Sequence, residues 1–139
     1  MNYLLDTNAC IALINGKPAP VRTRFAKAVD SGSEVCISSI VSFELWYGVY
    51  RGSQPDSNRR RLQTFLSGPI GWLAFEDEDA ESAGSIRATL EGSGKSIGAY
   101  DLLIAGQALH RQMTLVTANI SEFSRVPGLA WQDWAKPSA

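Results

Sequence analysis

The sequence predicts an α/β fold with a short, mostly parallel central sheet and helices on both of its faces. Short apolar runs such as Tyr3–Leu5, Val35–Ile37 and Thr114–Thr117 alternate with longer stretches of helical periodicity, and this alternation is typical of crossover units. The runs lack a polar face, as expected for strands covered on both sides. The length of 139 residues, with 45% apolar and 19% charged residues, fits one domain with one core.

The first half of the chain carries two expected strands and four expected helices. In chain order they are a strand at 3–5, helices at 9–14 and 21–30, a strand at 35–37, and helices at 40–51 and 58–66. Breaks such as Asn15–Pro18 and Gly52–Asp56 separate them. Asp6 or Asn8 is a suitable N-cap for the first helix, and Ser38 for the third.

The second half begins with a brief strand and then becomes mostly helical. The expected elements are a strand at 72–73, a helix at 76–90, a loop at 91–95, a helix at 98–111, a strand at 114–117, a short helix from 121 and a last strand at 129–131. The acids of Glu76–Asp79 suit a helix N-terminus because of the helix dipole. The helix at 98–111 is apolar almost all round, which predicts a core position. We expect one domain over 1–139, with a polar tail at 135–139.

Composition excludes several classes of protein. The net charge of −1 argues against a wholly basic nucleic-acid-binding surface, so any such binding needs a local patch. Cys10 and Cys36 stand in apolar surroundings, as buried free thiols of cytosolic proteins do. The N-terminus lacks the pattern of a signal peptide, and no apolar run is long enough to cross a membrane. We therefore expect a cytoplasmic protein without membrane contact.

Three carboxylates stand in unusual places. Asp6 ends the first strand, Glu44 lies among aromatic and apolar residues, and Asp101 lies near the start of the apolar helix. Ligands of parallel sheets bind beyond the carboxyl ends of the strands, and an ionised Asp in a core helix is costly unless it is paired or bound to a cation. The alternative is that Asp6 only caps a helix and that Asp101 is only stabilised by the helix dipole.

If the three acids converge, a divalent cation would relieve their repulsion. Oxygen ligands favour Mg²⁺ or Mn²⁺. Zinc is disfavoured because His110 is the single histidine and the cysteines lack ligand spacing. Magnesium keeps several of its waters, one of which can attack a phosphodiester. The acids therefore predict metal-dependent phosphodiester hydrolysis.

Rival chemistries fit less well. The stretch Gly92–Ser96 resembles the end of a P-loop, but Thr89 stands where the first glycine is required, and a helix precedes the loop. A haloacid-dehalogenase-like phosphatase would need an aspartate at Asn8. Two-histidine ribonuclease chemistry is excluded by the lone His110, which we expect to face solvent at a helix end, and no serine stands in a nucleophile elbow.

Two further groups of residues allow two interpretations each. The run Arg59–Arg61 could meet phosphates, or it forms a solvated helix face. Trp46, Tyr47 and Tyr50 could stack on bases, or they belong to the core or to a subunit interface.

Four motifs together resemble the PIN-domain family. They are Leu4-Leu5-Asp6-Thr7-Asn8, Ser42-Phe43-Glu44-Leu45-Trp46-Tyr47-Gly48, Ile97-Gly98-Ala99-Tyr100-Asp101-Leu102-Leu103-Ile104-Ala105, and Leu115-Val116-Thr117-Ala118-Asn119 followed by Glu122-Phe123, Pro127-Gly128-Leu129 and Trp134. Their order and spacing are similar to those of the VapC toxins of bacterial toxin–antitoxin pairs. The resemblance covers nearly the whole chain.

The resemblance implies a PIN-like α/β/α sandwich and an Mg²⁺- or Mn²⁺-dependent endoribonuclease. By motif position it makes Asp6, Glu44 and Asp101 the metal-binding and catalytic acids. Asn119 stands where the family often has a fourth acid, which brings a second metal ion into question. Thr7 and Thr117 would support the site by hydrogen bonds.

The resemblance also implies partners. They are an RNA substrate, with tRNA among the candidates, a small VapB-type antitoxin, and a second copy of the chain, in a homodimer or a toxin–antitoxin hetero-oligomer. The helices that carry Trp46, Tyr47 and residues 59–66 are candidate contact surfaces for the antitoxin or the second subunit. Two alternative functions remain. One is a binding module in an antitoxin-bound, operator-binding complex, and the other is a PIN-like RNA-processing nuclease outside such a pair.

Overall fold

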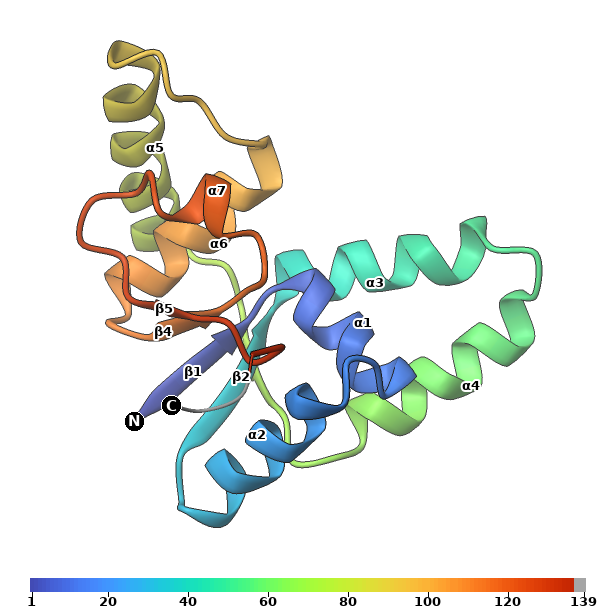
Figure 1. Cartoon of the computed structure of the whole chain (residues 1–139). Coiled ribbons are helices and arrows are strands. Elements are labelled where there is room, and N and C mark those ends of the chain that lie inside the picture. Colours follow the sequence, from blue (N-terminus) through green and yellow to red (C-terminus); the bar gives the residue numbers. More distant parts are fainter. Residues whose placement is uncertain (137–139) are drawn as a thin grey trace.

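The computed structural model describes residues 1–136, whose strands form one five-stranded sheet (Figure 1). The strands are β1 (Asn2–Leu5), β2 (Glu34–Ser38), β3 (Gly71–Leu73), β4 (Thr114–Val116) and β5 (Trp131–Gln132). The helices are α1 (Thr7–Asn15), α2 (Ala19–Asp30), α3 (Ser39–Arg51), α4 (Pro55–Leu66), α5 (Asp77–Gly92), α6 (Ala99–His110) and α7 (Ile120–Phe123). The α/β prediction is confirmed.

The sheet has the order β3-β2-β1-β4-β5, and each neighbouring pair is parallel. β1 lies at the centre, where Tyr3 pairs with Val35 on one side and with Thr114 on the other. From β1 the chain first builds outward to β3 and then returns to add β4 and β5 on the opposite side. The direction of winding therefore reverses between β1 and β4, and in open parallel sheets this switch point is where ligands bind.

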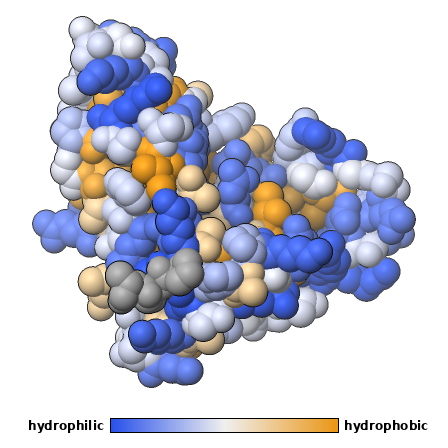
Figure 2. Space-filling view, in the orientation of Figure 1, coloured by the Kyte–Doolittle hydropathy of each residue, from blue (hydrophilic) through white to orange (hydrophobic). Residues whose placement is uncertain are grey.

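Helices cover both faces of the sheet, as expected for an α/β/α arrangement. α1, α2 and α4 gather on one side, and α5, α6 and α7 lie on the other, while α3 contacts both α4 and α6 (Figure 1). The molecular surface is notched between these two groups of helices, and apolar residues show on both sides of the notch (Figure 2). No helix within residues 1–136 combines the length and the apolarity that crossing a bilayer requires.

The core lies around the three central strands. Leu4, Leu5, Ile37 and Leu115 have no exposed surface, because a parallel sheet between two helical layers has no face in water. Cys10 and Cys36 are buried free thiols, as predicted from their surroundings.

α5 and α6 are held together by close packing and by a buried ion pair. A Cβ atom on Gly106 would lie 2.6 Å from the backbone of Ala83, so only glycine permits this approach of the two helices. Asp79 is fully buried, and Arg111 Nη2 lies 3.0 Å from its Oδ2. Burial alone would raise the pKa of Asp79, but the hydrogen bonds and charge of Arg111 prevail and lower it. The pair fixes the C-terminal end of α6 on α5.

Most element boundaries differ from those predicted by one to three residues, as for α4, which begins at Pro55 and not at residue 58. Three of the differences concern α1, α5 and β5. α1 begins at Thr7 rather than at residue 9, because Asp6 itself caps it. α5 extends to Gly92 and so takes in the first two residues of the predicted loop at 91–95, and Arg87 and Glu91 form an i, i+4 ion pair at 2.8 Å in its last turns. β5 occupies 131–132 rather than 129–131, opposite Leu115 and Val116.

The core interpretation of Tyr47 and Tyr50 is wrong. Both are exposed, because α3 turns Val41, Leu45 and Val49 inward and leaves the tyrosines on the opposite face. Trp46 is partly buried and packs against the core. Of the predicted polar tail at 135–139, residues 137–139 lie outside the described residues.

Candidate active site

Asp6 lies at the switch point, where β1 ends and α1 begins. Its Oδ1 accepts a hydrogen bond of 2.8 Å from the Ala9 N–H, which makes Asp6, and not Asn8, the N-cap of α1. The side chain is 5% exposed, and burial raises the pKa of Asp6, against the hydrogen bonds of Thr117 and Ala9 and with the help of the nearby charge of Glu44. The capping interpretation is therefore correct, and it is compatible with a role in the site because the second oxygen is not used by the cap.

Glu44 comes from the second turn of α3, which starts directly after β2. Ser38 begins that helix by accepting a 3.1 Å hydrogen bond from the Ile40 N–H, as expected from the sequence. The Thr7 hydroxyl donates a 2.7 Å hydrogen bond to Glu44 Oε1. This contact joins the start of α1 to α3 and fixes the Glu44 carboxylate close to Asp6.

Asp101 lies in the first turn of α6. It is half-buried, and its pKa is raised from 3.8 to about 7, first by burial and then by the hydrogen bond and charge of Glu122, with smaller contributions from the charges of Asp6 and Glu44. A helix N-terminus favours a negative charge, so the surrounding acids and burial outweigh the dipole. Asp101 does not cap the helix, since Gly98 is the N-cap of α6 and no side-chain hydrogen bond caps it.

Glu122, in the short helix α7, is the residue that the sequence reasoning missed. Its carboxylate faces Asp101, and the hydrogen bond between the two lowers the pKa of Glu122 while that of Asp101 rises. Asn119 Nδ2 donates a 2.7 Å hydrogen bond to Glu122 Oε2. The available signal was spacing, because side chains three positions apart at a helix start lie on the same side.

Asn119 itself follows β4 at the edge of the switch point. Its backbone N–H donates a 2.9 Å hydrogen bond to Thr117 Oγ1, and its side chain holds Glu122. This arrangement favours a positioning role for Asn119 over direct binding of an ion, and the fourth carboxylate at this position comes from Glu122.

The four acids thus come from four elements that are distant in sequence and repel one another. Within residues 1–136, Asp6, Glu44 and Asp101 form no ion pair with Lys or Arg. In that part of the chain no three acidic, His or Cys side chains converge closely enough to form a ready-made cage for an ion. The donor set fits a hard divalent cation because it consists of carboxylate oxygens. The pKa of Asp101 is raised first by burial and then by the neighbouring acids Glu122, Asp6 and Glu44.

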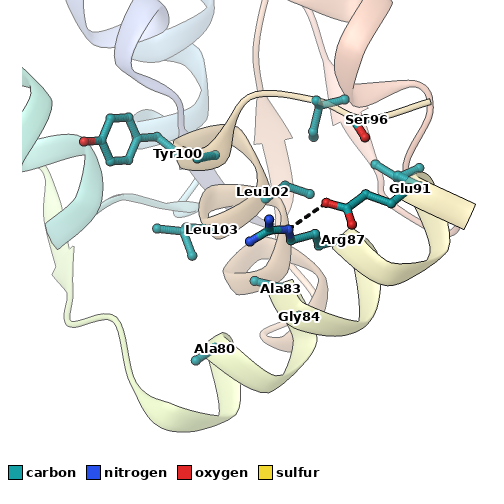
Figure 3. A pocket seen from close by; sticks show the side chains of 12 residues that line it. Ala80, Ala83, Gly84, Arg87, Glu91, Ser96, Tyr100, Leu102 and Leu103 are labelled. Carbon is teal, nitrogen blue, oxygen red and sulfur yellow. Dashed lines mark hydrogen bonds and ion pairs between the residues drawn. The ribbon is translucent and has the colours of Figure 1, made fainter. Parts of the chain in front are cut away.

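A cavity of about 400 Å³ opens elsewhere, between α5, the start of α6 and the loop that joins them (Figure 3). Alanine, glycine and leucine side chains dominate its lining, and its two charged residues, Arg87 and Glu91, pair with each other. None of the four acids lines it. The cavity is therefore separate from the acidic cluster.

The structure places neither the P-loop-like stretch nor His110 where the alternative chemistries would require it. The glycine-containing loop at 93–96 follows α5 and not a strand, so it is not a P-loop. His110 is exposed in the last turn of α6, as expected.

Comparison with known proteins agrees with the fold and the motifs. The PIN domain family model matches residues 3–129. A tRNA(fMet)-specific endonuclease VapC from Shigella flexneri is 40% identical over 97% of this chain and 99% of its own length. Ribonuclease VapC2 from Rickettsia felis is 38% identical over 98% of this chain and 100% of its own.

Solved structures agree as well. The crystal structure of VapBC2 from Rickettsia felis bound to a promoter DNA fragment matches with a TM-score of 0.88 and 36% identity, over 95% of this chain and 98% of that one. DNA-bound VapBC from Salmonella typhimurium matches with a TM-score of 0.88 and 38% identity, over 96% and 98% of the two chains. The chain belongs to the PIN domain family and, within it, to the VapC ribonucleases.

Proposed function

We propose that the chain is the toxin of a type II toxin–antitoxin pair and cuts RNA with Mg²⁺ or Mn²⁺ held by Asp6, Glu44 and Asp101. The observation that carries the proposal is the placement of Asp6 at the switch point of a VapC fold, with Thr7 holding Glu44 through a 2.7 Å hydrogen bond. The raised pKa of Asp101, caused first by burial and then by the neighbouring acids, agrees with it. When bound, the ion supplies charge neutralisation at the scissile phosphate and a water of lowered pKa.

The other residues around the cluster prepare it for this task. Thr7 keeps Glu44 turned toward Asp6. Asn119 and the Gly98 N–H hold the two oxygens of Glu122, at 2.7 and 3.4 Å, so that this carboxylate stays beside Asp101. In the metal-free protein the proton shared by Asp101 and Glu122 limits their repulsion, and it must leave before both can bind a cation.

The test is cleavage of RNA by the purified chain during a magnesium titration. Asp101→Asn should remove most of the cleavage, because it removes one ligand charge and leaves the shape of α6 unchanged. Asp30→Asn is the matched control, since Asp30 is an exposed acid at the end of α2, next to the amino end of β2. Equal cleavage by Asp101→Asn and the parent would contradict the assignment of Asp101. Cleavage that persists in excess chelator would contradict the dependence on Mg²⁺ or Mn²⁺.

We propose tRNA as the substrate class, because the relative from Shigella flexneri at 40% identity is named for cleavage of tRNA(fMet). Sequencing of the RNA ends produced by the parent, with Asp101→Asn as background, identifies the target. Ends spread over many RNA classes would contradict a tRNA-specific enzyme.

We propose a small VapB-type antitoxin as the partner, since the similar chains from Rickettsia felis and Salmonella typhimurium were solved as VapBC complexes bound to DNA. With a net charge of −1, the toxin is a poor DNA reader, so the antitoxin is expected to supply the DNA contacts. A gel-shift assay with operator DNA should therefore need both chains. A shift by the toxin alone would favour the binding-module function, and the absence of an antitoxin gene beside the toxin gene would favour an RNA-processing nuclease.

A further inference from the structure

Exposed aromatic side chains border the acidic cluster, and of these Tyr50 also stacks on the Trp46 ring with the centroids 6.1 Å apart. Phe43, Tyr47 and Tyr50 are 55%, 57% and 62% exposed, and Tyr100 is 48% exposed. We call these four residues the aromatic stripe. Exposed aromatic groups of this size are unusual on a surface without a binding role. Within residues 1–136, the four side chains of the stripe are neither part of the core nor hydrogen-bonded to the acids.

The stripe begins next to the acids. Phe43 directly precedes Glu44 on α3, and Tyr100 directly precedes Asp101 on α6. Their ring centroids are 5.7 Å apart with an interplanar angle of 60°. Tyr100 also stands at the border of the α5–α6 cavity, and its ring points away from Arg87 and Glu91 (Figure 3). Two rings from separate helices thus meet beside the cluster that would hold the scissile phosphate.

The stripe continues along α3 with positive charges over its rings. Positions 43, 47 and 50 lie on one face of a helix. The Arg51 guanidinium lies 5.9 Å from the centre of the Tyr47 ring, and the Arg59 guanidinium lies 5.4 Å from the centre of the Tyr50 ring. Alternating aromatic and cationic groups are what single-stranded nucleic acid needs, because the rings stack on bases while the cations meet phosphates.

We propose that Phe43 and Tyr100 stack on an unpaired base of the RNA substrate beside the scissile bond, and that the rest of the stripe binds the following nucleotides. This inference rests on the proposed ribonuclease function and adds the part of the substrate that is recognised. A contact with a second copy of the chain is the other use of such a face. It fits less well for Arg51, which is exposed and forms no ion pair within residues 1–136, because a two-fold contact would bring the Arg51 side chains of both copies into one face without an acid; Arg59 pairs with Asp56 at 3.5 Å.

The stacking is tested by removing the aromatic rings from the protein and, separately, the base from the RNA. In one series all proteins carry Asp101→Asn, so that RNA stays intact, and fluorescence anisotropy measures binding of a labelled twelve-nucleotide single strand in Mg²⁺. Phe43→Ala and Tyr100→Ala should each weaken binding about tenfold, while Phe43→Trp and Tyr100→Phe keep it. Trp72→Ala is the control, because Trp72 is 54% exposed on the edge strand β3 and lies outside the stripe. An abasic ribonucleotide at the stacked position should weaken parental binding about as much, and should add no further loss in the Ala variants.

Several results would overturn the proposal. One is unchanged binding by the Ala variants, another is equal binding of single-stranded and duplex RNA, and a third is no binding at all by the Asp101→Asn chain. Light scattering tests whether the stripe instead contacts a second copy of the chain. A change from dimer to monomer in Phe43→Ala or Tyr100→Ala would assign the stripe to that contact. Failure of the stacking proposal can be distinguished from failure of the proposed ribonuclease function. If the chain with Asp101 intact cuts RNA and the Ala variants keep its KM, only the stacking is wrong. If that chain cuts nothing while aromatic-dependent binding persists, the stacking stands without the nuclease.

Discussion

Replacing Asp101 by asparagine is expected to stabilise the metal-free protein at about pH 8 while it abolishes cleavage. Asp101 has a pKa raised from 3.8 to about 7 by burial, by Glu122, and by the charges of Asp6 and Glu44. The folded protein therefore holds the Asp101 proton more tightly than the unfolded chain does. Stability that is complete below pH 3.8 is lost as the pH rises through about 7. Asparagine, which stays neutral, avoids that loss.

The magnitude follows from the two pKa values. A difference between 3.8 and about 7 corresponds to about 4 kcal/mol if it is taken at full strength. Asp101 is only half-buried, and solvent screening reduces the effect, so about 2 kcal/mol is the expected gain in unfolding free energy for Asp101→Asn. The lowered pKa of Glu122 acts in the opposite direction. Its contribution is present above the ordinary pKa of 4.5 and is lost in acid, so it leaves the change toward pH 8 intact.

Urea unfolding followed by tryptophan fluorescence, in chelator, measures this difference. The difference in unfolding free energy between Asp101→Asn and the parent should be near zero at about pH 4 and about 2 kcal/mol at about pH 8. Saturating Mg²⁺ should reduce it by stabilising the parent. Asp30→Asn, the exposed control, should show no such growth with pH. If Asp101→Asn were no more stable than the parent at pH 8 in chelator, the conclusion that the acids repel one another would be refuted, and with it the main argument for a cation.

Two further substitutions test the surroundings of the cluster, and a third tests the ion pair that holds the C-terminal end of α6 on α5. Glu122→Gln should raise the Mg²⁺ concentration needed for half-maximal cleavage by about 10- to 100-fold, and cleavage that is equally weak at all Mg²⁺ concentrations would contradict a role in ion binding. Thr7→Val removes the 2.7 Å hydrogen bond to Glu44 and should slow cleavage about tenfold, at a stability cost of at most about 1.5 kcal/mol by urea unfolding, whereas Thr7→Ser should act as the parent. Arg111→Met leaves the fully buried Asp79 carboxylate without its cation and should cost about 3 to 5 kcal/mol of unfolding free energy. Because the pKa of Asp79 is lowered, that cost should shrink as the pH falls below 3.8, and a cost independent of pH would argue against the ion pair.

The sheet was predictable because its signals are local. Each of β1, β2 and β4 is a short apolar run, and a parallel sheet then brings Asp6 and the start of α3, which carries Glu44, to one edge. The helix boundaries were less predictable, because side chains that contact one another only in the folded chain decide them. The Asp6 cap moved the start of α1, and the pair of Arg87 with Glu91 lengthened α5.

The partner of Asp101 was not predictable from pattern alone. Glu122 lies 21 positions further along the chain, beyond β4. Its spacing from Asn119 indicates that the two side chains share a side of α7, but not that this side faces α6. Whether Tyr47 and Tyr50 face the core or the surface could not be decided from the sequence for a related reason. Helical spacing indicates that residues share a face, but only the packing of α3 on the sheet decides which face is inward.

The position of Glu122 changes how the replacement of a fourth acid by Asn119 is interpreted. An amide in place of a fourth acid removes one charge, which by itself would weaken the hold on a second ion. Here Asn119 donates its amide hydrogen to Glu122 at 2.7 Å, and Glu122 lies beside Asp101. The site therefore keeps four carboxylates, with the fourth displaced by three residues and positioned by the amide. Because the charge is conserved while its position moves, we expect Asn119→Asp to place a fifth carboxylate against Glu122. That change should raise the pKa of the Asp101–Glu122 pair further. Cleavage should then decline at about neutral pH and recover as the pH rises. Faster cleavage by Asn119→Asp at every pH would instead indicate that Asn119 itself faces the ion.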